Sequence, residues 1–337
     1  MICQQRAGLD DERRSSMEHA MTLPLWLDKL IFEELKGNYQ LSPKDVVYNP
    51  DQPIDFVRCY LGTYFPRSYV ESYAIIGDLM ENRIYFEELN GCEELNVVDF
   101  CCGTGGEIFG LISVLQHKLK HLKRIHVDAI DANPHAIRTL YKLAEQMKAL
   151  HQFNIEIDWN FHCFFINNHA DWADLIKMLN RPYQYIMSFK ALNELIQSKV
   201  FPNENVYYKM LSMFTPLLAH NGVLLIVDVA TKNDEMNLYY PQIMNMGMNH
   251  FVKEKKHFKS VIPAACYHYE QQCNACYMQD SFSVSHSRRQ LDLSKVAFRI
   301  VCPSSFADQF MKQVPSTVCN GNSQFVDKSD PYRSTLK

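Results

Sequence analysis

The sequence lacks any marked excess of charge of one sign. Its 34 Lys and Arg residues are balanced by 38 Asp and Glu residues, so the formal net charge is −4 at pH 7. A chain with this balance has no overall positive field that would hold it on a phosphate backbone. Any contact with a nucleic acid must therefore be local.

Long apolar runs are also missing. The purely apolar stretches are short, such as Gly222–Val227, whereas a membrane-spanning helix needs about 20 consecutive apolar residues. Residues 1–20 carry no apolar run of the kind found in a secretory signal, and Asp10, Asp11 and Glu12 are atypical of a mitochondrial transit peptide. We therefore expect a soluble, cytoplasmic protein that makes no contact with a membrane.

The pattern of apolar residues changes along the chain. Apolar residues recur at helical spacing from Thr22 to Lys36 and again after Pro66 as far as Asn90, whereas short aliphatic runs alternate with helical segments from Leu95 onward. No internal repeat is visible. The regions that we expect are a polar lead (1–21), a helical N-terminal region (22–92), an α/β domain (93–302) with a Cys-rich insertion (263–280), and a C-terminal tail (303–337), disordered from about residue 313.

Seven segments of the α/β domain predict strands of one sheet. Because helical segments connect the first five, and crossovers between parallel strands are right-handed, this part of the sheet is expected to be parallel with helices on both faces. The last two are separated by a short polar linker, which is hairpin spacing. The predicted fold class is thus α/β, a doubly wound, mostly parallel sheet with a helical N-terminal region and a closing antiparallel hairpin. The predicted strands are 96–100, 124–131, 156–165, 183–189, 222–230, 281–286 and 295–301.

A glycine-rich turn follows the first of these strands. Val97–Glu107 reads VVDFCCGTGGE, and the turn between the first strand and the first helix of such a sheet is where these folds bind nucleotides. Glycine lets a ligand approach main-chain atoms closely. Asp131 ends the next strand, where an acidic side chain can accept both hydroxyl protons of a ribose. Since the turn does not follow the G-x-G-x-x-G fingerprint of dinucleotide sites, the pattern favours an adenosine-like ligand.

VVDFCCGTGG and the later AIDANPHAI (129–137) together resemble the first motifs of the class I S-adenosylmethionine-dependent methyltransferases. The resemblance covers about residues 95–302 and implies a seven-stranded Rossmann-like sheet with S-adenosylmethionine as cofactor. It implies that Gly103 and Gly105 lie against the methionine portion, that Asp99 contacts its amino group, and that Asp131 holds the ribose. The full set of expected cofactor-binding residues is Asp99, Cys101, Gly103, Thr104, Gly105, Asp131, Ala132 and Ser188.

Two adjacent cysteines interrupt this motif. Cys101 stands where many members of the family carry a glycine, so it departs from the pattern and is expected to narrow the cofactor pocket. Cys102 is expected to be a packing residue, because a buried thiol beside a turn is usually inert.

The segment MSFKALNEL (187–195) follows the fourth strand, at the edge of the sheet that faces the substrate. Its polar residues Ser188, Lys190, Asn193 and Glu194 are therefore candidates for the site. The alternative is that Asn193 and Glu194 only begin the next helix. If the methyl acceptor starts protonated, the sequence offers Glu194 or His286 as its catalytic base.

The Cys-rich insertion is a candidate metal site. The chain has eleven cysteines, and Cys266, Cys273 and Cys276 lie within eleven residues, two of them as C-x-x-C. Thiolates at this spacing can converge on zinc or an iron–sulfur cluster. No second C-x-x-C follows, so clustered structural thiols remain the alternative. The options for a fourth ligand are His286, His268 and Cys302.

Three segments are similar to a narrower family, the ribosomal small-subunit methyltransferase-like proteins of bacteria and mitochondria. They are YLGTYFPRSYVESYA (60–74), LNEL (192–195) and the insertion that begins CYH (266–268). This resemblance implies an RNA acceptor, a link to the small ribosomal subunit and a four-cysteine iron–sulfur site. The spacing of the cysteines and the lack of a following proline depart from the family pattern.

The sequence thus predicts an S-adenosylmethionine-dependent methyltransferase (EC 2.1.1.-) that acts on RNA. Basic runs at 117–124 and 253–259 could contact phosphates, or could be solvated helix faces. One alternative is a small-molecule or natural-product acceptor, bound by aromatic residues. Another is a non-catalytic, cofactor-binding ribosome-assembly factor. The aromatic candidates are Tyr239, Tyr240, Phe251 and Tyr267.

Overall fold

The computed structural model describes residues 20–41, 51–269 and 279–314. The strands in these ranges are β1 (Met21–Thr22), β2 (Glu94–Phe100), β3 (Arg124–Asp131), β4 (Glu156–Cys163), β5 (Tyr183–Phe189), β6 (Leu218–Val229), β7 (Lys232–Asn233), β8 (Leu238–Tyr239), β9 (Phe258–Ile262), β10 (Asp280–His286) and β11 (Arg289–Pro303). The helices are α2 (Leu25–Lys29), η1 (Leu30–Glu34), α3 (Ile54–Glu81), α4 (Arg83–Asn90), α5 (Gly106–Lys118), α6 (Pro134–Ala149), α7 (His169–Met178), α8 (Leu192–Gln197), α9 (Val206–Phe214), η2 (Thr215–Leu217), α10 (Tyr240–Glu254), α11 (Ala264–Tyr269), α12 (Ser304–Phe310) and η3 (Met311–Gln313).

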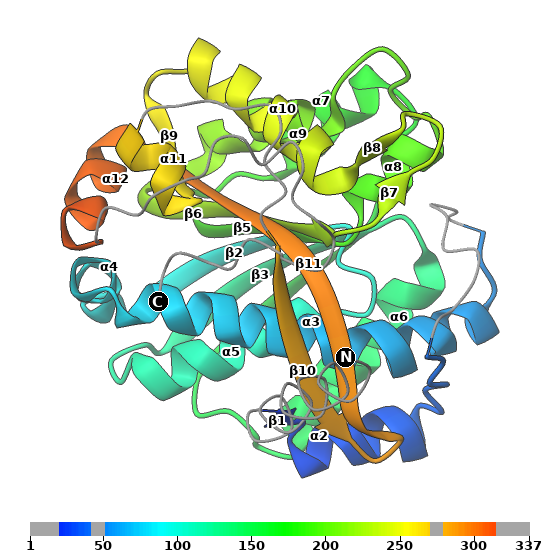
Figure 1. Ribbon diagram of the computed structural model, residues 1–337. Helices are drawn as coiled ribbons and strands as arrows, with labels where there is room; N and C mark the ends of the chain where they lie inside the picture. Colours follow the sequence, from blue (N-terminus) through cyan, green and yellow to red (C-terminus); the bar gives the residue numbers. More distant parts are fainter. Residues whose placement is uncertain (1–19, 42–50, 270–278, 315–337) are drawn as a thin grey trace, which may run out of the picture.

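One large mixed sheet organises the molecule, and its strand order is β1-β10-β11-β6-β5-β2-β3-β4 (Figure 1). Strands β2 to β6 are parallel, whereas β11 runs antiparallel to both β6 and β10. The predicted fold class, an α/β protein with a mostly parallel sheet and a closing antiparallel hairpin, is confirmed. Two strands of this sheet were not predicted: β1 pairs with β10, and β9 pairs with β11. The small separate sheet of β7 and β8 was not predicted either.

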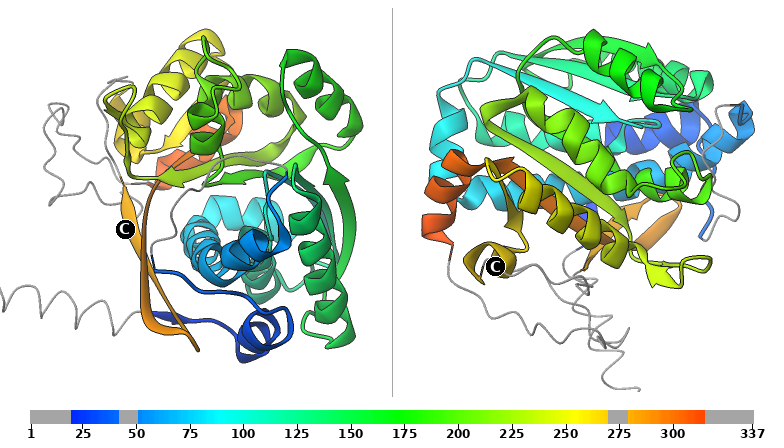
Figure 2. Two further views of the ribbon diagram at one scale, coloured as in Figure 1. Left: turned by 90° about the vertical axis from the view of Figure 1, so that its right-hand side faces the viewer. Right: turned by 90° about the horizontal axis from the view of Figure 1, so that it is seen from above.

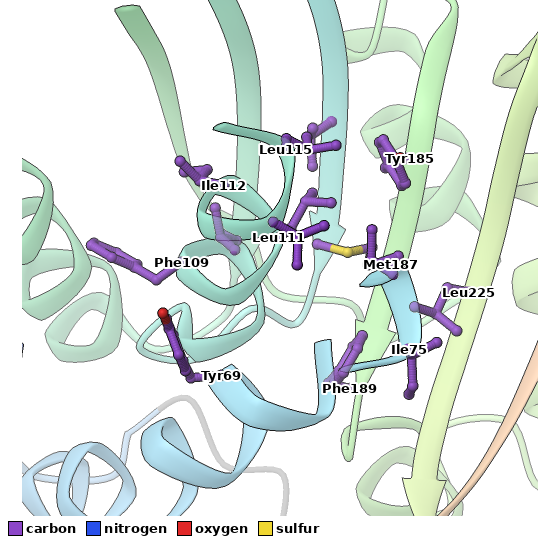
Figure 3. Close-up of a cluster of buried hydrophobic side chains, with 14 of the residues drawn as sticks. Tyr69, Ile75, Phe109, Leu111, Ile112, Leu115, Tyr185, Met187, Phe189 and Leu225 are labelled. Atoms are coloured by element: carbon purple, nitrogen blue, oxygen red, sulfur yellow. The ribbon is translucent and has the colours of Figure 1, made fainter. Parts of the chain in front are cut away.

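Helices cover both faces of the sheet, as the two further views show (Figure 2). On one face, α3, α5 and α6 enclose a hydrophobic cluster with the strands, and on the other face α7, α9 and α10 enclose a second cluster. Figure 3 shows the first cluster, in which Leu111 and Leu115 of α5 lie beside Met187 of β5. Both faces of the central strands are therefore buried, which explains their continuous aliphatic runs.

Helix α3 begins earlier than the sequence predicts. It runs unbroken from Ile54 through Pro66, although a proline inside a helix removes one main-chain hydrogen bond. Tertiary packing compensates, because α3 lies directly on α5. The main chain at Phe65 comes so close to Gly106 that a side chain on this glycine would collide with it. This contact brings the aromatic residues of α3 to the glycine-rich turn.

The hairpin and the C-terminal region also differ from prediction. The segment expected to be a polar linker belongs largely to β11, which begins at Arg289, and only a short turn separates it from β10. The predicted tail begins with a helix, α12, whose Phe306 and Phe310 pack against Tyr85. The disorder predicted for the end of the chain falls on residues 315–337, outside the described ranges. Among the helices that are described, none is long and apolar enough to cross a membrane.

Candidate active site

A pocket of about 480 Å³ lies at the carboxyl ends of β2, β3, β5 and β6. We call it the main pocket. A smaller cavity of about 70 Å³ adjoins it, shares Tyr60, Gly103, Thr104, Asp131 and Glu194 with it, and extends to Ala132. The main pocket is lined by Tyr60, Tyr64, Phe65, Ser68, Cys101, Cys102, Gly103, Thr104, Gly105, Gly106, Glu107, Asp131, Phe189, Lys190, Ala191, Asn193, Glu194, Gln197, Val229 and Thr231.

The glycine-rich turn forms one wall of the main pocket in a conformation that most residues avoid. Gly103 and Gly105 have φ angles of +52° and +82°, which lie in the left-handed region that glycine adopts without steric cost. Cys101 has φ +60°. A side chain in this region costs roughly 1–2 kcal/mol, so the chain places a cysteine where the geometry suits glycine. The main-chain N–H of Cys102 donates to Ile130 at 2.9 Å and fixes the turn to the end of β3.

Asp131 joins the turn to the next helix. Its carboxylate accepts hydrogen bonds of 2.8 Å from the main-chain N–H groups of Gly103 and Asn133. Each oxygen accepts one of these bonds, and a carboxylate has about four acceptor positions, so acceptor capacity remains on the pocket side. Burial raises the pKa of Asp131, while the two N–H donors act against this rise.

Asp99 and Ser188 lie behind the wall of the main pocket and do not line it. Both are fully buried, and neither side chain has a hydrogen-bond partner in the described structure. The residue that lines the pocket here is Glu107, which the sequence analysis did not select as a site residue. Burial, and then the neighbouring Glu107 and Asp131, raise the pKa of Asp99 well above its usual range. The sequence does contain a feature that could have identified Glu107: it is an acidic residue in the first turn of α5, directly after the glycines.

Glu194 lines both the main pocket and the smaller cavity that contains Asp131. It lies in the first turns of α8, and the Tyr60 hydroxyl of α3 donates to its Oε1 at 3.0 Å. Burial raises the pKa of Glu194 to about 8, Tyr60 acts against the rise, and Asp131 and Asp228 add to it. Asn193 and Glu194 therefore begin a helix and also line the pocket, so the two sequence interpretations are compatible.

Lys190 is the cation that lines the main pocket, but its charge is already paired. The Lys190 Nζ lies 2.6 Å from Oε2 of the fully buried Glu71, which also accepts a hydrogen bond from Ser294. Like Cys101, Lys190 has a positive φ, +55°. Among the described residues, no Lys, Arg or His forms an ion pair with the three lining carboxyls, Glu107, Asp131 and Glu194. The pocket therefore has an acidic lining.

His286, expected as a catalytic base or a metal ligand, does not line the main pocket. It lies at the tip of the β10–β11 hairpin, where it stacks on Phe32 and lies 3.6 Å from Asp292. Cys266 follows β9, whose Ile262 pairs with Ile300 near the other end of β11. Arg289, opposite His286, lies eleven positions before Ile300 in β11, which is on the order of 35 Å at about 3.3 Å per residue. The two ends of β11 thus keep His286 away from Cys266.

The other expected metal ligands fall partly outside the described structure. Cys266 lies in α11 and is partly buried, whereas Cys273 and Cys276 belong to 270–278, which is not described. In the described ranges, no group of three or more His, Cys, Asp or Glu residues is arranged to hold a metal ion.

The basic runs lie at the edge of the sheet opposite to the main pocket. The run 117–124 ends at the start of β3, and its charges are largely paired. The run 253–259 extends from the end of α10 into the start of β9, which pairs with the end of β11 beside the start of β6. It contributes to a second pocket of about 420 Å³. The ion pairs of the first run are Lys118–Glu81, Lys123–Glu93, Arg124–Glu94 and Arg124–Glu156.

The aromatic residues expected to bind a small acceptor are not those that line the main pocket. Tyr240 and Phe251 are buried in α10, and Tyr267 lines the second pocket. The aromatic side chains that do line the main pocket are Tyr60, Tyr64, Phe65 and Phe189. Three of them come from α3, whose approach to the sheet depends on tertiary packing.

The fold is a doubly wound α/β sheet with a pocket at the carboxyl ends of its strands. A scan against protein-family models returned no match, and a search of curated proteins likewise found no relative. Solved structures with a similar fold include the plantazolicin methyltransferase BpumL in complex with SAH, at 14% identity over 69% of this chain and 76% of that chain, with a TM-score of 0.35.

Two further similar structures are S-adenosylmethionine-dependent methyltransferases from bacteria. The one from Aquifex aeolicus has 12% identity over 74% of this chain and 99% of that chain, with a TM-score of 0.35. The one from Clostridium acetobutylicum has 11% identity over 69% of this chain and 92% of that chain, with a TM-score of 0.36.

Proposed function

We propose that this protein is an S-adenosylmethionine-dependent methyltransferase whose methyl donor binds in the main pocket. The observation that supports this most is the position of the glycine-rich turn and Asp131. The chain winds from β2 through β3 to β4 on one side of β2, and returns through β5 and β6 on the other. Doubly wound sheets bind nucleotides at the carboxyl ends of the strands where this reversal occurs.

The lining residues fit an adenosyl sulfonium compound. Asp131 has spare acceptor capacity for the two ribose hydroxyls, and the left-handed turn at Gly103 leaves its main chain open, because a Cβ there would meet no atom within 4 Å. Glu107 offers a carboxyl to the amino group of the donor. When bound, S-adenosylmethionine would supply a methyl group already activated by its sulfonium, so the protein's part is largely to position the reactants.

The lining of the main pocket favours a small-molecule acceptor over RNA. Among the described residues, its lining offers no unpaired cation to a phosphate, because Lys190 is paired with Glu71, and both basic runs lie at the opposite edge of the sheet. Four aromatic side chains add apolar surface, as is common in sites for small molecules. RNA is the second candidate acceptor, and a non-catalytic assembly factor is the alternative function. The transfer experiment below distinguishes these two possibilities from a small-molecule acceptor.

Calorimetric titration of the full chain with S-adenosylmethionine tests the proposal. We expect one binding event that is competed by S-adenosylhomocysteine. Absence of heat at millimolar cofactor would overturn the proposal. If the donor binds, transfer of a tritiated methyl group to small molecules supports the methyltransferase, transfer to RNA supports the second acceptor, and transfer to neither favours the assembly factor.

A further inference from the structure

The main pocket contains more carboxyl groups than the methyl donor requires. Asp131 is placed for the ribose, and Glu107 for the amino group of the donor, on the proposed function. Glu194, which lines both the main pocket and the smaller cavity, remains without a task. Since burying an uncompensated carboxylate is costly, a cationic group that binds beside Glu194 would be stabilised there.

The surroundings of Glu194 suit a cation in a second way. Its partner Tyr60 has its ring centroid 5.1 Å from that of Tyr64, and both rings line the main pocket. Aromatic faces attract ammonium groups by cation–π interaction. The nearest lining cation, Lys190, does not compete for Glu194 because it is paired with Glu71. A carboxyl and two aromatic rings thus converge from α8 and α3, which are far apart in the sequence.

We propose that the methyl acceptor is a small-molecule amine that enters as an ammonium ion, and that Glu194 binds this ion and takes its proton. This inference rests on the proposed function. The volume of about 480 Å³ must hold the donor as well as the reacting end of the acceptor, so this end must be slim. Pockets of this size typically enclose one drug-sized ligand.

The reaction balances without a further reactant. An alkyl amine has a pKa near ~10, so it arrives protonated at neutral pH and has no lone pair for attack. Glu194 accepts one N–H proton, and the freed nitrogen lone pair forms a bond to the methyl carbon. The bond from this carbon to sulfur breaks, its electron pair stays on sulfur, and a neutral thioether and an N-methylammonium product result. A pKa of about 8 for Glu194 places its protonation change near neutral pH.

The test uses the full chain, tritiated S-adenosylmethionine and a small-molecule cell extract separated by ion exchange into cationic, neutral and anionic fractions. We expect the label in the cationic fraction. Glu194→Gln should lower this transfer at least ~100-fold, within the range given for general acid–base catalysis. It should change the affinity for S-adenosylmethionine, measured by calorimetry, less than about twofold. Glu145→Gln, at an exposed position of α6, is the matched control and should behave as the natural chain.

The outcomes distinguish this inference from the proposed function. If the donor does not bind, both are wrong. If it binds and the label enters mainly the neutral fraction, the anionic fraction, RNA or no fraction, only the amine assignment is wrong. An equal loss of donor affinity and transfer in Glu194→Gln would place Glu194 at the donor and overturn its role as base.

Discussion

The Asp131 carboxylate accepts a hydrogen bond of 2.8 Å from the main-chain N–H of Gly103. The bond connects the end of β3 to the turn after β2, so the acid expected to hold the ribose also shapes the turn expected to receive the donor. Asp131→Asn keeps the size of the side chain and removes its charge. We expect this variant to bind S-adenosylmethionine about 10- to 100-fold more weakly, equivalent to about 1–3 kcal/mol for a charge-assisted hydrogen bond.

Calorimetry measures this effect. The control is Asp174→Asn, at an exposed position of α7 whose ion pair with Lys177 lies outside the main pocket. It should bind the donor as the natural chain does. Unchanged affinity in Asp131→Asn would show that the ribose lies elsewhere.

Gly105→Ala is expected to destabilise the fold. The φ of +82° is unfavourable for alanine, and the added Cβ would lie 2.5 Å from Cδ1 of Leu140. Because the collision involves the end of a flexible side chain, we expect a loss of about 1–3 kcal/mol in the free energy of unfolding, mostly from the backbone. Gly77→Ala, inside α3 with no atom near the new Cβ, should instead stabilise by about 0.5–1 kcal/mol. Urea unfolding of both variants would show the opposite signs; equal effects would refute the backbone explanation.

Cys101 provides a third prediction, because its φ of +60° fits glycine better than cysteine. Cys101→Gly should keep the free energy of unfolding within about 1 kcal/mol of the natural value, since the relief of strain offsets the extra entropy of the unfolded chain. Cys101→Val should lose about 2 kcal/mol or more, since a β-branched residue rarely adopts positive φ. If Cys101→Val were as stable as Cys101→Gly in urea unfolding, Cys101 would not be strained.

The buried carboxyls predict a specific dependence of stability on pH. Burial raises the pKa of both Glu107 and Glu194 from 4.5 to about 8. Between these values the folded chain holds more protons than the unfolded chain, so its stability falls as pH rises. The stabilisation is present in full below about pH 4.5 and is lost as pH passes through 8.

Glu194→Gln removes one of these protons. The free energy of unfolding of this variant should therefore fall less steeply with pH between pH 5 and 8 than that of the natural chain. The two slopes should differ by at most about 1.4 kcal/mol per pH unit. Urea unfolding without ligand at several pH values measures the slope. Parallel profiles for Glu194→Gln and the natural chain would show that Glu194 does not titrate in this window.

Local sequence patterns were sufficient for the parallel sheet, the glycine-rich turn and Asp131. Each depends on short apolar runs, on glycine at turns, or on the end of one strand. The Tyr60–Glu194 pair could not be predicted, because 134 residues separate its members and helix packing joins them. The position of His286 likewise depends on the length of β11, whose polar first half reads as a linker. Both features are set by long-range packing, about which local sequence patterns hold no information.

A crystal structure of the full chain with S-adenosylhomocysteine tests the central claim most directly. We predict that the ribose hydroxyls lie within hydrogen-bond distance of Asp131, and that the sulfur faces a space bounded by Tyr60 and Glu194. Binding of S-adenosylhomocysteine in the second pocket, or a ribose remote from Asp131, would contradict the proposed site.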